Sequence, residues 1–160
     1  MTDLRIGLGY DVHAFADDRA LVLGGVELSH PRGLAGHSDA DVLVHALMDA
    51  ILGAMRSGDI GAHFPDTDPA WAGASSIALL ERVGALMRAD GWDLADADTV
   101  LVLESPRISP HRDAMRARMA EALGVDVARI GLKATTTEGL GLTGRGEGVA
   151  AQAVVLLERS

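Results

Sequence analysis

Three residues in the first third of the chain have the side chains and the spacing of a metal site. Asp11 and His13 stand two residues apart, and His45 follows in a helical pattern. Side chains two apart in a strand project from the same face, so Asp11 and His13 could bind one ion. Three protein ligands with an open fourth position are typical of catalytic zinc. Surface or hydrogen-bonded histidines would give the same spacing, and that alternative stays open.

A second group with chemical potential is the segment Lys133–Glu138, which reads Lys-Ala-Thr-Thr-Thr-Glu. Its hydroxyls and backbone amides suit phosphate oxygens, and Glu138 suits a hard cation such as Mg²⁺. A threonine-rich strand end followed by an ordinary turn explains the segment equally well. The glycine-rich run 139–148 lacks the Gly-Lys-Ser/Thr of a P-loop, and the pair Gly7 and Gly9 lacks the context of a dinucleotide-binding fold.

The composition of the 160 residues excludes several classes of protein. Fourteen basic against 23 acidic side chains give a net charge of −9, which argues against nucleic-acid binding. The absence of cysteine excludes disulfides and thiolate metal sites, so a metal would need histidine and carboxylate ligands. No apolar run reaches about 18 residues and the start lacks a signal peptide's apolar stretch. We therefore expect a cytoplasmic protein that binds neither nucleic acid nor membrane.

The periodicity of apolar residues predicts the elements that position these side chains. We expect strands over residues 4–13, 20–23, 26–28, 98–104, 129–135 and 148–158, and helices over about 39–55, 75–90 and 110–123. Strands alternating with helices predict an α/β (α+β) sandwich, one mixed β-sheet layered with about three helices, in a single domain of residues 1–160.

Two local features of the predicted first helix concern the metal residues. Ser38 and Asp41 resemble a capping box at its start. Asp41, His45 and Asp49 follow one another at four-residue intervals and predict one polar stripe. Such a stripe is also typical of the solvated side of a helix. The polar segment 58–69, with two prolines and no periodicity, is expected to be a long loop.

Several segments, in order, resemble one enzyme family. They are residues 9–13, 36–42 with His45, 58–61, 64–68, 133–138 and 143–148. Together they are similar to the 2-C-methyl-D-erythritol 2,4-cyclodiphosphate synthases of non-mevalonate isoprenoid biosynthesis, from about Arg5 to Leu157.

This resemblance implies a phosphorus–oxygen lyase. The family converts 4-diphosphocytidyl-2-C-methyl-D-erythritol 2-phosphate into the cyclic diphosphate and releases CMP. It also implies a homotrimer whose sheets face the three-fold axis and whose active sites lie between subunits. From the residues alone, a metal-dependent phosphohydrolase and a non-catalytic trimer that binds a nucleotide or isoprenoid phosphate stay as alternatives.

The resemblance also implies the roles of individual residues. Asp11, His13 and His45 would hold one Zn²⁺ per subunit, and Glu138 would position Mg²⁺ (or Mn²⁺) on the substrate diphosphate. Asp49, one turn after His45, would orient the imidazole or simply be solvated.

The catalytic and substrate-binding positions follow from the same motifs. The residues matched to transition-state stabilisation are His37 and Thr136. The residues matched to substrate binding are Asp11, Val12, His13, His37, Ser38, Asp59, Ile60, Gly61, Phe64, Pro65, Asp66, Thr67, Asp68, Leu103, Glu104, Ser105, Pro106, Arg107, Ile108, Ser109, Thr135, Thr136, Thr137, Glu138, Leu142 and Arg145.

The chain departs from the family pattern at two places. Gly139 and Leu142 stand where the family commonly has Lys and Phe, which removes one positive charge and changes the lining of the trimer's central cavity. Arg107 stands where the family often has Lys, and it keeps the charge with a different geometry.

Overall fold

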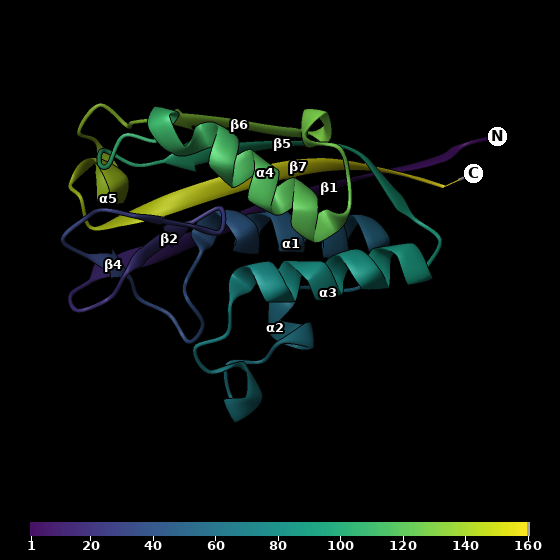
Figure 1. The fold of residues 1–160 in the computed structure, drawn as a ribbon, viewed down its shortest axis with the longest axis horizontal. Coiled ribbons are helices and arrows are strands. Elements are labelled where there is room, and N and C mark those ends of the chain that lie inside the picture. Colours follow the sequence, from purple (N-terminus) through teal and green to yellow (C-terminus); the bar gives the residue numbers. More distant parts are fainter. Residues whose placement is uncertain (160) are drawn as a thin grey trace.

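A twisted, mixed β-sheet carries the three long helices on one of its faces, as the computed structural model of the chain shows for residues 1–159 (Figure 1). The sheet strands are β1 (Asp3–Ala16), β4 (Gly33–Leu34), β5 (Asp93–Val102), β6 (Ile130–Thr135) and β7 (Gly148–Arg159), and β2 (Leu21–Leu23) pairs with β3 (Val26–Leu28) beside them. The helices are α1 (Val42–Met55), α2 (Ile60–His63), α3 (Ser76–Ala89), α4 (Arg112–Leu123) and α5 (Gly141–Gly144), with 3₁₀ turns at Pro69–Trp71, Ser109–His111 and Val127–Arg129.

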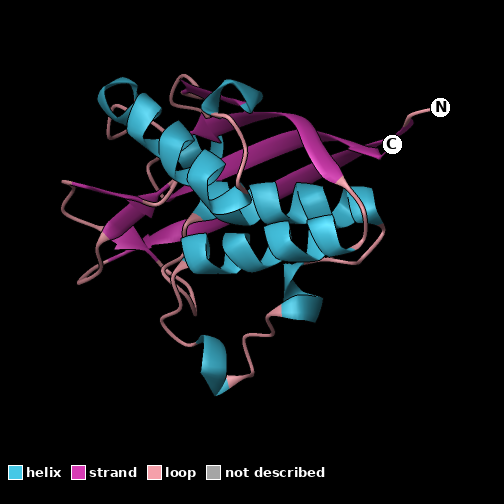
Figure 2. Cartoon of the chain, turned by 45° about the vertical axis from the view of Figure 1, so that its right-hand side comes forward, coloured by secondary structure: helices cyan, strands magenta, loops and turns pink. Residues whose placement is uncertain are grey.

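The strand order β4-β1-β7-β5-β6 confirms the predicted single mixed sheet. β7 runs antiparallel to both β1 and β5, whereas β5 and β6 are parallel. The ladder between β1 and β7 extends from the pair Asp3–Arg159 to the pair Ala14–Gly148. Figure 2 shows the strands of the sheet lying side by side. The end of β1 that carries Asp11 and His13 is held by the long ladder of backbone hydrogen bonds to β7.

Helix α1 lies unusually close to β1, and two glycines of that strand make this possible. A Cβ atom on Gly9 would stand 1.8 Å from the carbonyl oxygen of Ala46, and one on Gly7 would stand 1.9 Å from that of Ala50. Both distances are far below van der Waals contact. Gly7 and Gly9 thus let α1 lie on the strand, which brings His45 next to β1.

We expect Gly9→Ala to destabilise the protein by about 3 kcal/mol, since overpacking against a rigid backbone forces the helix away from the sheet. Chemical denaturation checks this value. The matched control is Gly53→Ala in α1, where an added Cβ meets nothing within 4 Å. Equal stability of the two variants would contradict the close-packing account.

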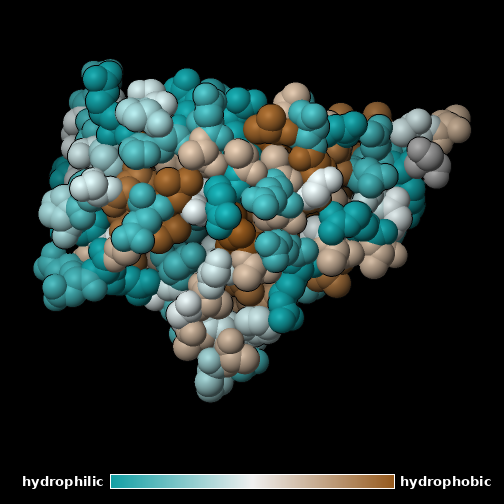
Figure 3. Space-filling view, viewed as in Figure 1, coloured by the Kyte–Doolittle hydropathy of each residue, from teal (hydrophilic) through white to brown (hydrophobic). Residues whose placement is uncertain are grey.

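The two faces of the sheet differ in what they expose. Hydrophilic residues cover much of the helix-bearing side, with hydrophobic residues showing between them (Figure 3). On the opposite face β1 exposes a row of large apolar side chains. These are Leu4, Ile6, Leu8, Tyr10 and Val12. Their alternation with Gly7 and Gly9 follows from the two-residue period of a strand.

None of the helices within residues 1–159 is long and apolar enough to span a membrane.

The structure corrects the predicted start of the first helix. Asp41, not Ser38, is the N-cap: its side chain accepts from the backbone N–H of Val44 and also from those of Gly24 and Gly25. Asp41 and His45 are buried, so the predicted polar stripe is not a solvated face.

Other boundaries differ by less. The long polar loop contains the short helix α2 and one 3₁₀ turn, and β5 begins at Asp93 rather than at residue 98. The third long helix begins at Arg112 because a 3₁₀ turn occupies Ser109–His111. Ser75 is the N-cap of α3, and its side chain accepts from the N–H of Ala78.

Candidate active site

Asp11, His13 and His45 bring three ligand atoms together beside the start of α1. Asp11 Oδ2 lies 2.9 Å from His13 Nε2 and 3.1 Å from His45 Nδ1, and the two nitrogens are 3.2 Å apart. A tetrahedral zinc ion with bonds of about 2.0 Å has its ligands roughly 3.3 Å apart. The triangle therefore fits one such ion, and the two-nitrogen, one-carboxylate donor set suits zinc.

The ring of His13 is oriented by its other nitrogen. His13 Nδ1 lies 2.7 Å from the carbonyl oxygen of Ala35, which only accepts hydrogen bonds. Nδ1 must therefore carry the proton, and the lone pair of Nε2 faces Asp11 and His45. The backbone of the segment after β4 thus presets this histidine as a metal ligand.

Asp49 does not orient His45. Its Oδ1 accepts from the backbone N–H of Ile60 at 2.8 Å and so fixes the start of α2. The His45 Nε2 atom instead faces two hydroxyls, Ser76 Oγ at 3.0 Å and Ser38 Oγ at 3.2 Å. The sequence analysis missed Ser76, because only the tertiary packing of α3 against α1 brings it to the site.

Charge within this cluster shifts two pKa values. Burial disfavours the charged form of Asp11. The hydrogen bonds and positive charges that His13 and His45 offer in their doubly protonated form outweigh this and hold the pKa of Asp11 well below its usual range. Burial likewise disfavours charged His13, yet the hydrogen bond and charge of Asp11 raise the pKa of His13 above its ordinary value. In the metal-free protein the pair is therefore ionic at mildly acidic pH.

We expect the metal-free protein to gain stability from this pair below the ordinary histidine pKa of about 6.5 and to lose it as pH rises through the raised pKa of His13. The folded state binds the His13 proton more tightly than the unfolded chain, so deprotonation favours unfolding. Urea denaturation of the metal-free protein at about pH 5.5 and about pH 8, below and above the ordinary histidine pKa, measures the effect.

The control for this measurement is His13→Asn, which removes the titrating group. The stability difference between the two pH values should shrink in that variant. An unchanged difference would contradict the assignment to His13.

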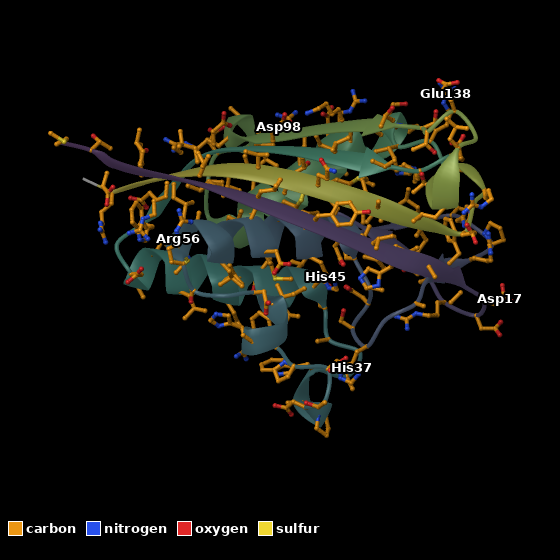
Figure 4. The ribbon with its side chains drawn as sticks, turned by 180° about the vertical axis from the view of Figure 1, so that it is seen from behind. Asp17, His37, His45, Arg56, Asp98 and Glu138 are labelled. Carbon is orange, nitrogen blue, oxygen red and sulfur yellow. The ribbon has the colours of Figure 1, made fainter. Side chains whose placement is uncertain are left out.

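A cavity of about 430 Å³ opens beside the metal ligands. Two of its lining residues, His37 and His45, are labelled in Figure 4. Its lining includes these residues expected to bind substrate: Asp11, His13, His37, Ser38, Ile60, Gly61, Phe64, Pro65 and Asp66. The cavity also takes in residues that the sequence analysis missed: Gly36, Met48, Trp71 and Leu79. Trp71 packs edge-on against Phe64, with ring centroids 5.2 Å apart. Its place as an aromatic residue just after a polar loop was the sequence feature that could have indicated Trp71 as a cavity residue.

Four expected residues near this cavity lie outside its lining. Val12 is on the opposite, outer face of β1. Asp59 and Asp68 use their side chains to cap the short helical turns that follow them, by accepting from the N–H groups of Ala62 and Ala70. Thr67 is exposed in the loop and does not line the cavity.

A second pocket, of about 270 Å³, gathers most of the other expected residues. Its lining is Leu103, Glu104, Pro106, Arg107, Ile108, Ser109, Arg112, Ala134, Thr135 and Thr136. Arg112 and Ala134 are additions to the expected set, and Ser105 does not line the pocket. Glu104 Oε1 accepts from the N–H groups of Thr137 and Gly139, which ties the pocket to the turn after β6.

The two pockets share no lining residue. Glu138 lies exposed at the far edge of the sheet, well away from His37 and His45 (Figure 4). Arg145, also expected at the substrate, forms an exposed ion pair with Glu147 at 2.8 Å, and Leu142 is exposed beside it. One chain therefore presents two separate pockets.

Comparisons with known proteins point to a single family. The family model described as "YgbB family" matches residues 4–158. The 2-C-methyl-D-erythritol 2,4-cyclodiphosphate synthase of Trichlorobacter lovleyi is 56% identical over 154 residues, 96% of this chain and 98% of the relative.

Two solved structures resemble the fold. The bifunctional IspDF from Campylobacter jejuni superposes with a TM-score of 0.96 at 42% identity, covering 100% of this chain and 43% of that longer one. The CDP complex of IspF from Plasmodium falciparum gives a TM-score of 0.86 at 31% identity and covers 98% of this chain and 97% of that one.

Proposed function

We infer, from the premise that the chain belongs to the YgbB family, that it converts 4-diphosphocytidyl-2-C-methyl-D-erythritol 2-phosphate into 2-C-methyl-D-erythritol 2,4-cyclodiphosphate and CMP. It is a phosphorus–oxygen lyase of non-mevalonate isoprenoid biosynthesis. The observation that carries the function is the three-ligand cluster of Asp11, His13 and His45 at the wall of a cavity. We further propose one domain over residues 1–160 and a cytoplasmic location.

The proposed reaction is an intramolecular phosphoryl transfer. An oxygen of the 2-phosphate attacks the β-phosphorus and closes the ring through a new phosphorus–oxygen bond. The bond from the β-phosphorus to the oxygen shared with the α-phosphate breaks, and CMP leaves with that oxygen. Since both phosphates belong to one molecule, alignment and charge neutralisation supply most of the rate.

The chain's residues divide this work between metal binding and hydrogen bonding. Asp11, His13 and His45 would hold Zn²⁺, and Glu138 would hold Mg²⁺ (or Mn²⁺) at the diphosphate. When bound, these cations neutralise the crowded phosphate oxygens. His37, exposed at the cavity, and Thr136, in the second pocket, would donate hydrogen bonds to oxygens that gain charge in the transition state.

The remaining expected residues would bind the two ends of the substrate. Asp59, Gly61 and the loop residues 64–68 would hold the methylerythritol hydroxyls, and Ser38 would lie at the phosphate. The second pocket, with residues 103–109 and 135–137, would hold the cytidine. The known CDP complex of a relative supports a nucleotide as the ligand class.

We also propose a homotrimer in which one chain's cavity faces a neighbour's second pocket. Two observations support it: the two pockets are separate within one chain, and β1 exposes a row of apolar side chains on the helix-free face. Burial of that row around a three-fold axis would place the sheets toward the axis. The oligomer would complete the site.

Phosphorus NMR of the products tests the function. The zinc- and magnesium-loaded protein should convert the cytidyl substrate into equal amounts of CMP and a cyclic diphosphate, with no inorganic phosphate. Protein stripped with a chelator is the control and should release no CMP. Release of an open bisphosphate or inorganic phosphate would show a phosphohydrolase instead, and binding without CMP release would show a non-catalytic trimer.

A further inference from the structure

The nitrogen of His45 that faces away from Asp11 and His13 ends in a buried hydrogen-bonded chain. His45 Nε2 lies 3.0 Å from Ser76 Oγ, and Ser76 Oγ donates to Asp39 Oδ1. Ser76 is 0% exposed, and His45 is nearly as buried. Neither Asp39 nor Ser76 is among the residues expected to bind the metal or the substrate or to act in catalysis.

The chemistry of the three groups fixes the direction of these hydrogen bonds. An ionised carboxylate only accepts hydrogen bonds, so the single hydroxyl proton of Ser76 is used in the hydrogen bond that Ser76 donates to Asp39. Ser76 Oγ can then only accept from His45, which requires the proton of the imidazole to sit on Nε2. The lone pair of the neutral ring is then on Nδ1, the atom that faces Asp11 and His13.

We propose that Asp39 and Ser76 are positioning residues that hold His45 in the Nε2–H tautomer and so prepare its Nδ1 atom to bind the metal. This inference rests on the proposed function, because that function supplies the metal. Hydrogen-bonded partners of this kind commonly change metal affinity by 10- to 100-fold.

The same two residues also join the starts of two helices. Asp39 lies just before α1, Ser76 is the first residue of α3, and Asp39 Oδ2 accepts from the Ser76 backbone N–H at 3.0 Å. This backbone contact survives Ser76→Ala, whereas the hydroxyl contact to His45 does not. Ser76→Ala therefore separates the positioning role from the structural one.

Ser38 supplies the matched control. The Ser38 hydroxyl lies 3.2 Å from the same Nε2 atom and accepts from the N–H of Ala40. Ser38 also lines the cavity, and no hydrogen bond from its hydroxyl to a carboxylate is found among the described residues. Its hydroxyl is therefore free to donate to a substrate, and its direction toward His45 is not fixed. We expect Ser38→Ala to leave zinc affinity within about 3-fold of wild type, below the range for orienting partners.

The test is zinc affinity, measured by competition with a fluorescent chelator on the full chain, together with the melting temperature of the metal-free protein. Ser76→Ala should weaken zinc binding by about 10- to 100-fold while the metal-free melting temperature stays near that of Ser38→Ala. In Asp39→Asn the side-chain amide can donate to Ser76 Oγ, so the Ser76 hydroxyl can turn and donate to His45 instead. This variant should also weaken zinc binding, and it replaces Ser76→Ala in the test if Ser76→Ala does not fold.

Two results would overturn the proposal. Zinc affinity in Ser76→Ala equal to wild type would remove the positioning role, as would an equal loss in Ser38→Ala. Failure of the wild-type protein itself to bind zinc at micromolar concentration would overturn the metal centre of the proposed function and the inference with it. The wild-type titration thus tells the two failures apart.

Discussion

Replacing His45 with alanine is expected to remove bound zinc and lower CMP release by at least about 10³-fold, which corresponds to roughly 4 kcal/mol of transition-state stabilisation. Two ligands remain, Asp11 and His13, and two do not make a catalytic zinc site. The phosphate oxygens would then lack their main source of neutralising charge. Metal analysis of the purified variant and a CMP-release assay measure both effects.

The fold should survive this substitution, because the other buried residues of α1 keep the helix on the sheet. His30→Ala is the control: His30 is half-buried, bonds to Arg32 and stacks on Phe15, but lies outside the metal cluster. The control should keep zinc and turnover. Near-normal turnover of zinc-free His45→Ala would contradict a catalytic metal at this site.

A charge on the outer face of β1 is expected to dissociate the proposed trimer and lower turnover by at least about 100-fold, while each chain still binds zinc. Ile6 and Leu8 are 70% and 68% exposed in the single chain. An aspartate at Leu8 costs the monomer little, but burying one such charge per subunit around an axis costs several kcal/mol each. Loss of the neighbour would remove the second pocket from the cavity and leave the metal ligands intact.

Light scattering, zinc content and CMP release of Leu8→Asp are the three measurements. Leu86→Asp is the control, because Leu86 is an exposed apolar residue of α3, on the helix-bearing side. That variant should remain trimeric and active. A fully active monomer of Leu8→Asp would show that one chain holds a complete site.

Features that depend on the pattern within one strand or one helix could be predicted from the sequence. The alternation along β1 placed Asp11 and His13 on one face, and the helical pattern placed His45 on the element that packs there. Gly7 and Gly9, dismissed as a nucleotide motif, proved to be the reason why α1 and β1 lie close enough for the three to meet.

The sequence failed where function depends on contacts between distant segments. Ser38 and Asp41 are both good cap residues, and only the N–H groups of Gly24 and Gly25 favour Asp41. Asp49 is one turn from His45, yet the start of α2 takes its carboxylate. The hydroxyl of Ser76 reaches His45 through the packing of α3 on α1, which no local pattern contains.

One metal ion held by Asp11, His13 and His45 is the centre of the proposed function, and anomalous diffraction on crystals of the zinc-loaded protein locates that ion. Data collected above and below the zinc absorption edge should give one strong difference peak per chain, about 2.0–2.1 Å from His13 Nε2, His45 Nδ1 and an oxygen of Asp11. A zinc peak elsewhere, with none between these three atoms, would contradict the account.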